Sequence, residues 1–227
     1  MSAPDLVLVA HGTRDPRGVD TVQQLAAAVR AHGVVVHLAF VDVLGPTVSA
    51  VLITVAGPVV VVPAFLAAGY HVRTDVPVEV RASGHRAVHV TAALGPAPAL
   101  AAVQRARLRE AGWRPGDGVV LAAVGSRDPL AREDVGTAAQ LLSANLGTPV
   151  RHGYAVASEP TVRQAVAQLR SESARRVVIS PYLLAPGLFH TKLAEAGADL
   201  VAAPMGVHPV LVELLLRRYR DLSGPSQ

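Results

Sequence analysis

The sequence has no cysteine and few aromatic residues: one tryptophan, three phenylalanines and four tyrosines in 227 residues. The absence of cysteine excludes disulfide bonds, thiolate metal sites and a cysteine nucleophile, which leaves histidine and carboxylate as ligands for a transition metal. No uninterrupted apolar run approaches the roughly eighteen residues of a membrane span, and the N-terminus lacks the pattern of an export signal. We therefore expect a cytoplasmic protein with no membrane partner.

Lysine is also nearly absent, since Lys192 is the only one, and the formal net charge of +4 comes almost entirely from arginine. Arginine binds carboxylate or phosphate in a bidentate manner, which suits an anionic ligand, although codon bias explains the same enrichment. The basic residues are scattered, and few aromatic residues are present to stack on bases. We therefore expect no nucleic-acid partner.

Three sequence blocks occur twice in the same order. Residues 6–16, which include His11, return near residues 121–129, where Val124 replaces the histidine; the other pairs are residues 40–48 with 154–162, and 59–69 with 177–187. The offset of roughly 115 residues is too long for a solenoid repeat and indicates a duplicated domain. We predict an N-terminal domain over residues 1–113 and a C-terminal domain over residues 114–227. An imidazole kept in one copy alone indicates a single asymmetric reactive site.

Short apolar runs alternate with segments of helical periodicity in both halves. Predicted strands cover residues 6–10, 34–40, 59–62, 119–124, 149–154 and 177–180, and predicted helices cover residues 19–31, 46–55, 96–111, 130–145, 160–170 and 208–221. Continuous apolar strands that alternate with helices are typical of a parallel sheet covered on both faces. The predicted fold class is α/β, with two tandem flavodoxin-like domains.

Two histidines follow strands that are neighbours in this fold. His11 comes directly after the first strand and His71 lies in the loop after the third, and these strands are adjacent in the common order 2-1-3-4. Because adjacent strands lie about 4.8 Å apart, we expect the two imidazoles to face the same small volume. A metal site there competes with the simpler interpretation that His11 caps the following helix. The loss of the imidazole at Val124 argues against a cap, because both halves need one.

These residues carry a family resemblance that covers almost the whole chain. The segments around His11 and His71, residues 11–16 and 63–77, resemble the two-repeat form of the sirohydrochlorin chelatases of sirohaem and cobalamin biosynthesis, and residues 125–129 and 181–187 add to the likeness. The resemblance implies chelatase-like domains. It also implies a lyase that inserts Fe²⁺ or Co²⁺ into a carboxylate-rich tetrapyrrole, sirohydrochlorin, with His11 and His71 as metal-binding and catalytic residues.

The implied roles agree with elementary chemistry. The macrocycle loses two N–H protons as it gains a dication, and a neutral imidazole acts as a ligand or a base near neutral pH. Two histidines with open coordination positions hold such an ion while pyrrole nitrogens displace its water. The metal is then a substrate, and no tightly bound cofactor is expected.

Several further residues have open roles. Related chelatases often carry glutamate where this chain has Asp42, which either binds the metal, orients His11 or caps the next helix. Arg14, Arg73 and Arg127 either pair with substrate carboxylates or lie solvated at the surface, and Tyr70 either lines the ring or packs under its loop. The role of His190 is open, whereas the remaining six histidines, His32, His37, His85, His89, His152 and His208, are interpreted as structural.

Two other functions are disfavoured by the sequence. Residues 151–153 read Arg-His-Gly, as in histidine phosphatases, but they lie in mid-chain and have no counterpart in the first half. No glycine-rich phosphate-binding motif follows a strand, so the reaction is expected to proceed without ATP. A non-catalytic metal or tetrapyrrole carrier is the alternative function. A monomer is expected because both halves of the cleft belong to one chain, and the sequence leaves the choice of metal open.

Overall fold

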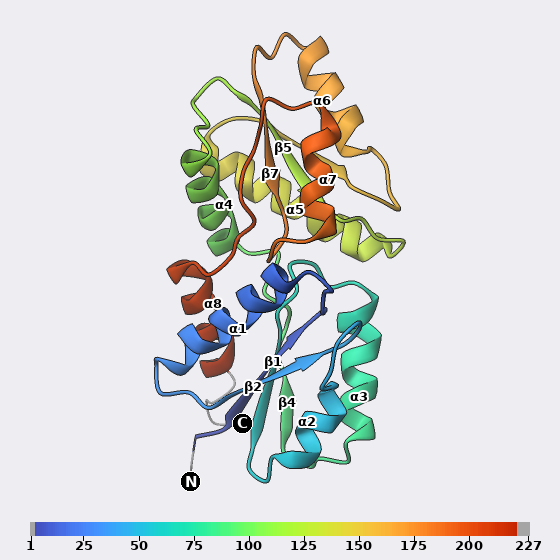
Figure 1. Ribbon diagram of the computed structural model, residues 1–227, viewed down its shortest axis with the longest axis vertical. Helices are drawn as coiled ribbons and strands as arrows, with labels where there is room; N and C mark the ends of the chain where they lie inside the picture. The colour runs from blue at the N-terminus through green and yellow to red at the C-terminus, as the bar shows by residue number, and fades with distance from the viewer. Residues whose placement is uncertain (1–2, 222–227) are drawn as a thin grey trace.

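The computed structural model describes residues 3–221 and contains two four-stranded parallel sheets (Figure 1). Their strand orders are β2-β1-β3-β4 and β6-β5-β7-β8, so the predicted duplicated flavodoxin-like fold is confirmed. The strands of the first sheet are β1 (Asp5–Ala10), β2 (Val36–Phe40), β3 (Val59–Pro63) and β4 (Val88–Val90). Those of the second are β5 (Gly118–Ala123), β6 (Val150–Tyr154), β7 (Val177–Pro181) and β8 (Leu200–Val201).

The helices follow the strands in the same order in both halves. The first half contains α1 (Pro16–Arg30), α2 (Val48–Thr54), the π-helix η1 (His71–Asp75), α3 (Val76–Ala82) and α4 (Pro98–Glu110). The second contains α5 (Pro129–Leu146), α6 (Val162–Ser171), α7 (Leu188–Leu193), the 3₁₀-helix η2 (Ala194–Ala196) and α8 (Pro209–Arg220). The sequence did not predict β4, β8, η1, α3, α7 or η2, because such short elements carry too few residues to show a period.

Both faces of each sheet are buried. In β1 the side chains of Leu6 and Leu8 pack into one hydrophobic cluster and those of Val7 and Val9 into another, and all four are fully buried. Successive side chains of a strand point to opposite faces, so a continuous apolar strand requires helices on both sides. Helices α1 and α8 cover one face of the first sheet, and α2 and α3 cover the other.

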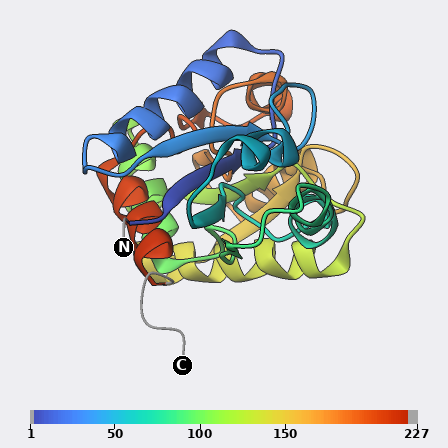
Figure 2. The same ribbon diagram turned by 90° about the horizontal axis from the view of Figure 1, so that it is seen from below.

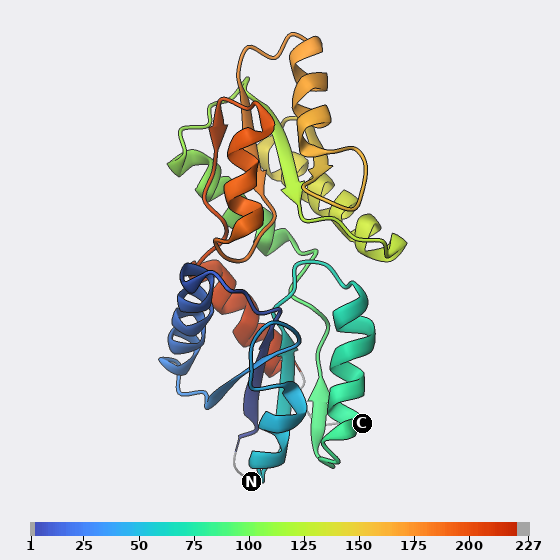
Figure 3. The ribbon, with the colours of Figure 1, turned by 45° about the vertical axis from the view of Figure 1, so that its right-hand side comes forward.

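The two halves exchange one helix each. Helix α4 leaves the first half and packs against α5 and β7 of the second, and α8 returns to pack against α1 and β3 of the first. Figures 1 and 3 show the two crossing segments, and Figure 2 shows α8 beside α1 from below. One hydrophobic cluster therefore runs through both halves. The predicted division after residue 113 follows the duplication, but each sheet is covered in part by a helix from the other half. Residues 1–2 and 222–227 of the two predicted domains lie outside the described part.

Within residues 3–221, no helix combines the length and the apolar character required to cross a lipid bilayer.

Candidate metal and substrate site

The site lies at the carboxyl ends of β1 and β3. These strands pair in parallel with Val9 opposite Pro63, so their ends lie side by side. His11 follows β1 directly, and His71 opens η1 after a loop of residues 64–70. The two imidazole centroids are 4.7 Å apart with the rings nearly perpendicular, at 85°. The structure thus brings together the two histidines that the sequence selected.

The backbone beside His11 is tightly constrained. Gly12 has a φ of +94°, and a Cβ at this position would lie 2.1 Å from the carbonyl oxygen of Asp42. The amide of Asp42 in turn donates to the His11 carbonyl. Helix α1 is capped by Asp15, whose carboxylate accepts a hydrogen bond from the amide of Arg17, and so His11 is not the cap.

We predict that Gly12→Ala disrupts this strand end. The substitution combines a left-handed backbone, which costs an alanine about 1–3 kcal/mol, with a direct backbone clash. Gly33→Ala is the matched control, because Gly33 has a φ of +79° but open space around its Cβ position. Urea unfolding should show a larger loss of stability for Gly12→Ala. Equal losses would contradict the importance of the close approach to Asp42.

The orientation of His71 is set by a residue that the sequence analysis did not select. Nδ1 of His71 lies 2.6 Å from Oδ2 of Asp75, four residues later. A carboxylate only accepts hydrogen bonds, so Nδ1 carries a hydrogen, and in the neutral form of the ring Nε2 carries the free lone pair. Single-turn π-helices such as η1 often occur at functional sites. The four-residue spacing of His and Asp was the available signal in the sequence.

Aromatic side chains border the two imidazoles. The Phe65 ring lies 6.4 Å from that of His11 and 6.3 Å from that of His71, between centroids, which makes it an apolar wall that the sequence analysis also missed. Tyr70 is 62% exposed, and its ring centroid is 6.2 Å from that of His71. This exposure is incompatible with packing under the loop and leaves the phenol ring available to a ligand.

Asp42 makes local hydrogen bonds at the neighbouring strand end. Its Oδ1 accepts from the amide of Val43 at 2.7 Å, and α2 is capped by Thr47, which accounts for the cap without Asp42. Residues 3–221 contain no group of three or more histidine and carboxylate side chains placed to hold one metal ion. The histidine pair therefore stands without a third protein ligand here, and a metal-binding role of Asp42 stays a prediction.

The three candidate arginines differ in their surroundings. Arg14 and Arg127 are exposed, on the loops that follow the first strand of each half. Arg73 is held between the halves: its Nε donates to the carbonyl of Ala68 at 2.6 Å and lies 3.8 Å from Oδ2 of Asp128. Arg14 and Arg127 are therefore free to move toward an anionic ligand, whereas Arg73 is already engaged.

Several other histidines make structural contacts. Nε2 of His190 lies 3.2 Å from the Ala202 carbonyl oxygen, and the residue that aligns with His71 in the second half is Phe189. His37 pairs with Asp5, and His208 caps α8. The second half therefore offers no equivalent imidazole pair.

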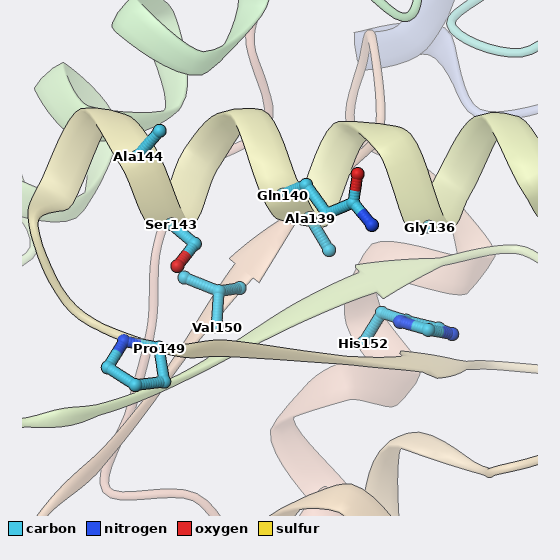
Figure 4. A pocket seen from close by; sticks show the side chains of 8 residues that line it. All are labelled: Gly136, Ala139, Gln140, Ser143, Ala144, Pro149, Val150 and His152. Carbon is cyan, nitrogen blue, oxygen red and sulfur yellow. The ribbon is translucent and has the colours of Figure 1, made fainter.

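A pocket of about 490 Å³ lies away from the histidine pair, between α5 and β6 (Figure 4). It is lined mostly by small side chains of α5 and by His152, whose ring stands against Tyr154 at 5.6 Å between centroids. Burial lowers the pKa of His152. A neutral, half-buried imidazole agrees with the structural role expected for it.

Comparison with known sequences finds a matching family model and a curated relative. The model of the CbiX family matches residues 5–111 and again residues 118–222. A chloroplastic sirohydrochlorin ferrochelatase of Arabidopsis thaliana is 27% identical over 111 residues, a match that covers 44% of this chain and 49% of that protein. The match thus spans about half the length of this curated relative.

Solved structures share the fold over nearly the whole chain. SirB from Bacillus subtilis with Fe³⁺ superposes with a TM-score of 0.84 at 22% identity, over 97% of this chain and 95% of that one. SirB from Bacillus subtilis subspecies spizizenii in complex with cobalt gives 0.80 at 20% identity, over 97% and 95%. DR2241 from Deinococcus radiodurans gives 0.74 at 26% identity, over 96% of this chain but 54% of that protein. The two family matches fall on the two halves described above.

Proposed function

The chain belongs to the CbiX family, and from this we propose that it inserts Fe²⁺ or Co²⁺ into sirohydrochlorin without ATP. The observation that carries the proposal is the 4.7 Å approach of the His11 and His71 rings at the carboxyl ends of adjacent strands. Ligands of open parallel sheets bind at this edge. The metal is a substrate, and both ions accept histidine ligands.

The two imidazoles have complementary tasks in this reaction. With the hydrogen of His71 on Nδ1, its Nε2 holds the incoming dication. The His11 ring, edge-on to that of His71, holds the same ion through its own free lone pair. As pyrrole nitrogens replace the two imidazoles on the metal, the freed lone pairs of His11 and His71 accept the two N–H protons that the macrocycle loses. Two protein ligands leave coordination positions that pyrrole nitrogens occupy.

We assign the surrounding residues to the macrocycle. Arg14 and Arg127 approach its carboxylates from the two halves, Arg73 contributes from the His71 loop, and Tyr70 lies against the ring face. Asp42 joins the metal through Oδ2 in this proposal, because the amide of Val43 occupies only Oδ1. In this proposal the protein acts in the cytoplasm. It acts as a monomer, because both halves that contact the macrocycle belong to one chain.

A metallation assay tests the proposal against a carrier function. Purified protein is mixed with sirohydrochlorin and either Co²⁺ or Fe²⁺ under anaerobic conditions, and the absorbance change of the macrocycle is followed with and without protein. We expect catalytic amounts of protein to accelerate the change over many turnovers. A carrier would bind metal or tetrapyrrole without raising the rate above that of the protein-free mixture, and this result would overturn the chelatase assignment.

A further inference from the structure

The loop that leads to His71 is held by the half of the chain that lacks the metal-site histidines. Two of its backbone groups, the amide of Ala68 and the carbonyl of Leu66, form hydrogen bonds with side chains more than sixty positions later in the sequence. Gly69 also lies near α5, since a Cβ at this position would be at an ordinary packing distance, 3.6 Å, from Cβ of Ala131. The second half thus approaches the loop at Leu66, Ala68 and Gly69.

Asp134 supplies the acceptor for the loop amide. Its Oδ2 accepts the hydrogen bond of Ala68 N–H at 2.8 Å from the second turn of α5. Charge-assisted hydrogen bonds of this kind are roughly twice as strong as neutral ones. Ala68 lies three residues before His71, so this bond fixes the backbone immediately ahead of the imidazole.

Tyr182 supplies the donor for the loop carbonyl. Its hydroxyl donates to Leu66 O at 2.7 Å, and the residue is only 4% exposed. Burial, with the nearby Asp134 charge, raises the pKa of the phenol, so the group stays a donor. Gly95, on the segment that crosses to α4, makes room for this bond: its Cβ would lie 2.3 Å from Leu66 O and 2.5 Å from the Tyr182 hydroxyl.

The reciprocal hydrogen bonds are impossible in the duplicated loop. The residue that aligns with Ala68 is Pro186, which has no amide hydrogen, and the residue that aligns with Tyr182 is Ala64, which has no hydroxyl. Thr21 aligns with Asp134, and its hydroxyl donates instead to the carbonyl of Arg17 in its own helix. The duplicated loop instead packs closely against helix α1 of the first half, because a Cβ on Gly18 would lie 2.7 Å from the carbonyl oxygen of Pro186.

We propose that Asp134 and Tyr182 are positioning residues that hold the His71 loop so that both imidazoles share one metal ion. The C-terminal half, which has Val124 in place of His11, thus carries the polar groups that order the His71 loop of the N-terminal half. This inference rests on the proposed function, in that His71 is taken to hold the metal. It assigns the duplicated half a task that sheet packing alone does not require.

The test uses Co²⁺ alone as probe, followed by its visible absorption bands, together with hydrogen exchange of the loop amides in the full chain. We expect Asp134→Ala to raise the dissociation constant for Co²⁺ by about 10-fold, as loss of an outer-shell partner typically does, and to speed exchange over residues 64–71. Asp134→Asn keeps an acceptor oxygen and should restore most of the affinity. Tyr182→Phe should act in the same direction as Asp134→Ala.

Tyr219→Phe is the matched control, because the Tyr219 hydroxyl also donates to a backbone carbonyl, that of Pro4, at 2.7 Å. Pro4 precedes β1, so the control lies at the opposite end of that strand from His11. Unchanged Co²⁺ affinity and spectrum in both Asp134→Ala and Tyr182→Phe would overturn the positioning role, as would an equal loss in Tyr219→Phe. His71→Ala distinguishes a failure of the proposed metal site from a failure of the positioning role. If this variant binds Co²⁺ as the wild type does, the metal site is wrong, and the positioning role that rests on it is wrong as well.

Discussion

His11→Ala should reduce catalysed metal insertion to the rate of the protein-free mixture. The substitution removes one of two imidazoles that lie 4.7 Å apart, and with it a metal ligand and a proton acceptor. A positioned general base alone contributes about 10²–10⁴-fold to a rate, so we expect a loss of at least about 100-fold. Initial rates with Co²⁺ and sirohydrochlorin, measured beside the protein-free mixture, give the comparison directly.

His190→Ala is the control for this experiment. His190 lies in the C-terminal half, where it is partly buried and its ring contacts the backbone carbonyl of Ala202. We expect near-normal activity, with at most a small loss of stability from the missing hydrogen bond. Wild-type rates in a folded His11→Ala protein would remove His11 from the mechanism. A loss of activity in His190→Ala equal to that in His11→Ala would show that the site extends into the second half.

Asp75→Asn should lower kcat/KM for metal insertion by about 10–100-fold, the usual effect of changing the partner that orients a metal-binding histidine. The change keeps the size of the side chain but replaces the carboxylate that lies 2.6 Å from Nδ1 of His71. An amide offers both a donor and an acceptor, so the imidazole is no longer restricted to the tautomer with a free Nε2. Co²⁺ affinity, measured without the tetrapyrrole, should fall together with activity.

Asp5→Asn is the matched control, because Asp5 and His37 form a second aspartate–histidine pair away from the site, at the start of β1. Oδ2 of Asp5 lies 2.9 Å from Nε2 of His37, at the start of β1, whereas His11 follows its end. The same chemical change there should leave Co²⁺ affinity and activity unaltered. A normal Co²⁺ affinity in Asp75→Asn would show that His71 binds metal without the help of this carboxylate.

The two duplicated halves contribute different groups to the site. Both retain the strand–glycine turn, since Gly12 and Gly125 have φ values of +94° and +109° and each would clash with a facing carbonyl if it carried a Cβ. The first half keeps both imidazoles, and the second keeps the polar groups that reach the His71 loop. The exchange of α4 and α8 joins the halves through one hydrophobic cluster.

The amino-acid sequence by itself determined the duplication, the parallel α/β fold and the approach of His11 to His71. These features follow from periodicity and from strand order, because residues that end adjacent parallel strands meet at one edge of the sheet. The strands and helices show as patterns within ten or twenty residues, and the duplication shows as the return of such blocks after roughly 115 residues. The asymmetry between His11 and Val124 is equally visible in the sequence.

Only the tertiary structure decided which half each helix covers and what holds His71 in place. Helix α4 has the same apolar periodicity whether it packs on its own sheet or on the other, and periodicity carries no information about the partner surface. The pairing of His71 with Asp75 lies within the π-helix η1, which the sequence did not predict. The contacts of Ala68 with Asp134 and of Leu66 with Tyr182 join segments far apart in the chain. Such contacts depend on how the two halves dock, which is a property of their complementary surfaces and not of any local pattern.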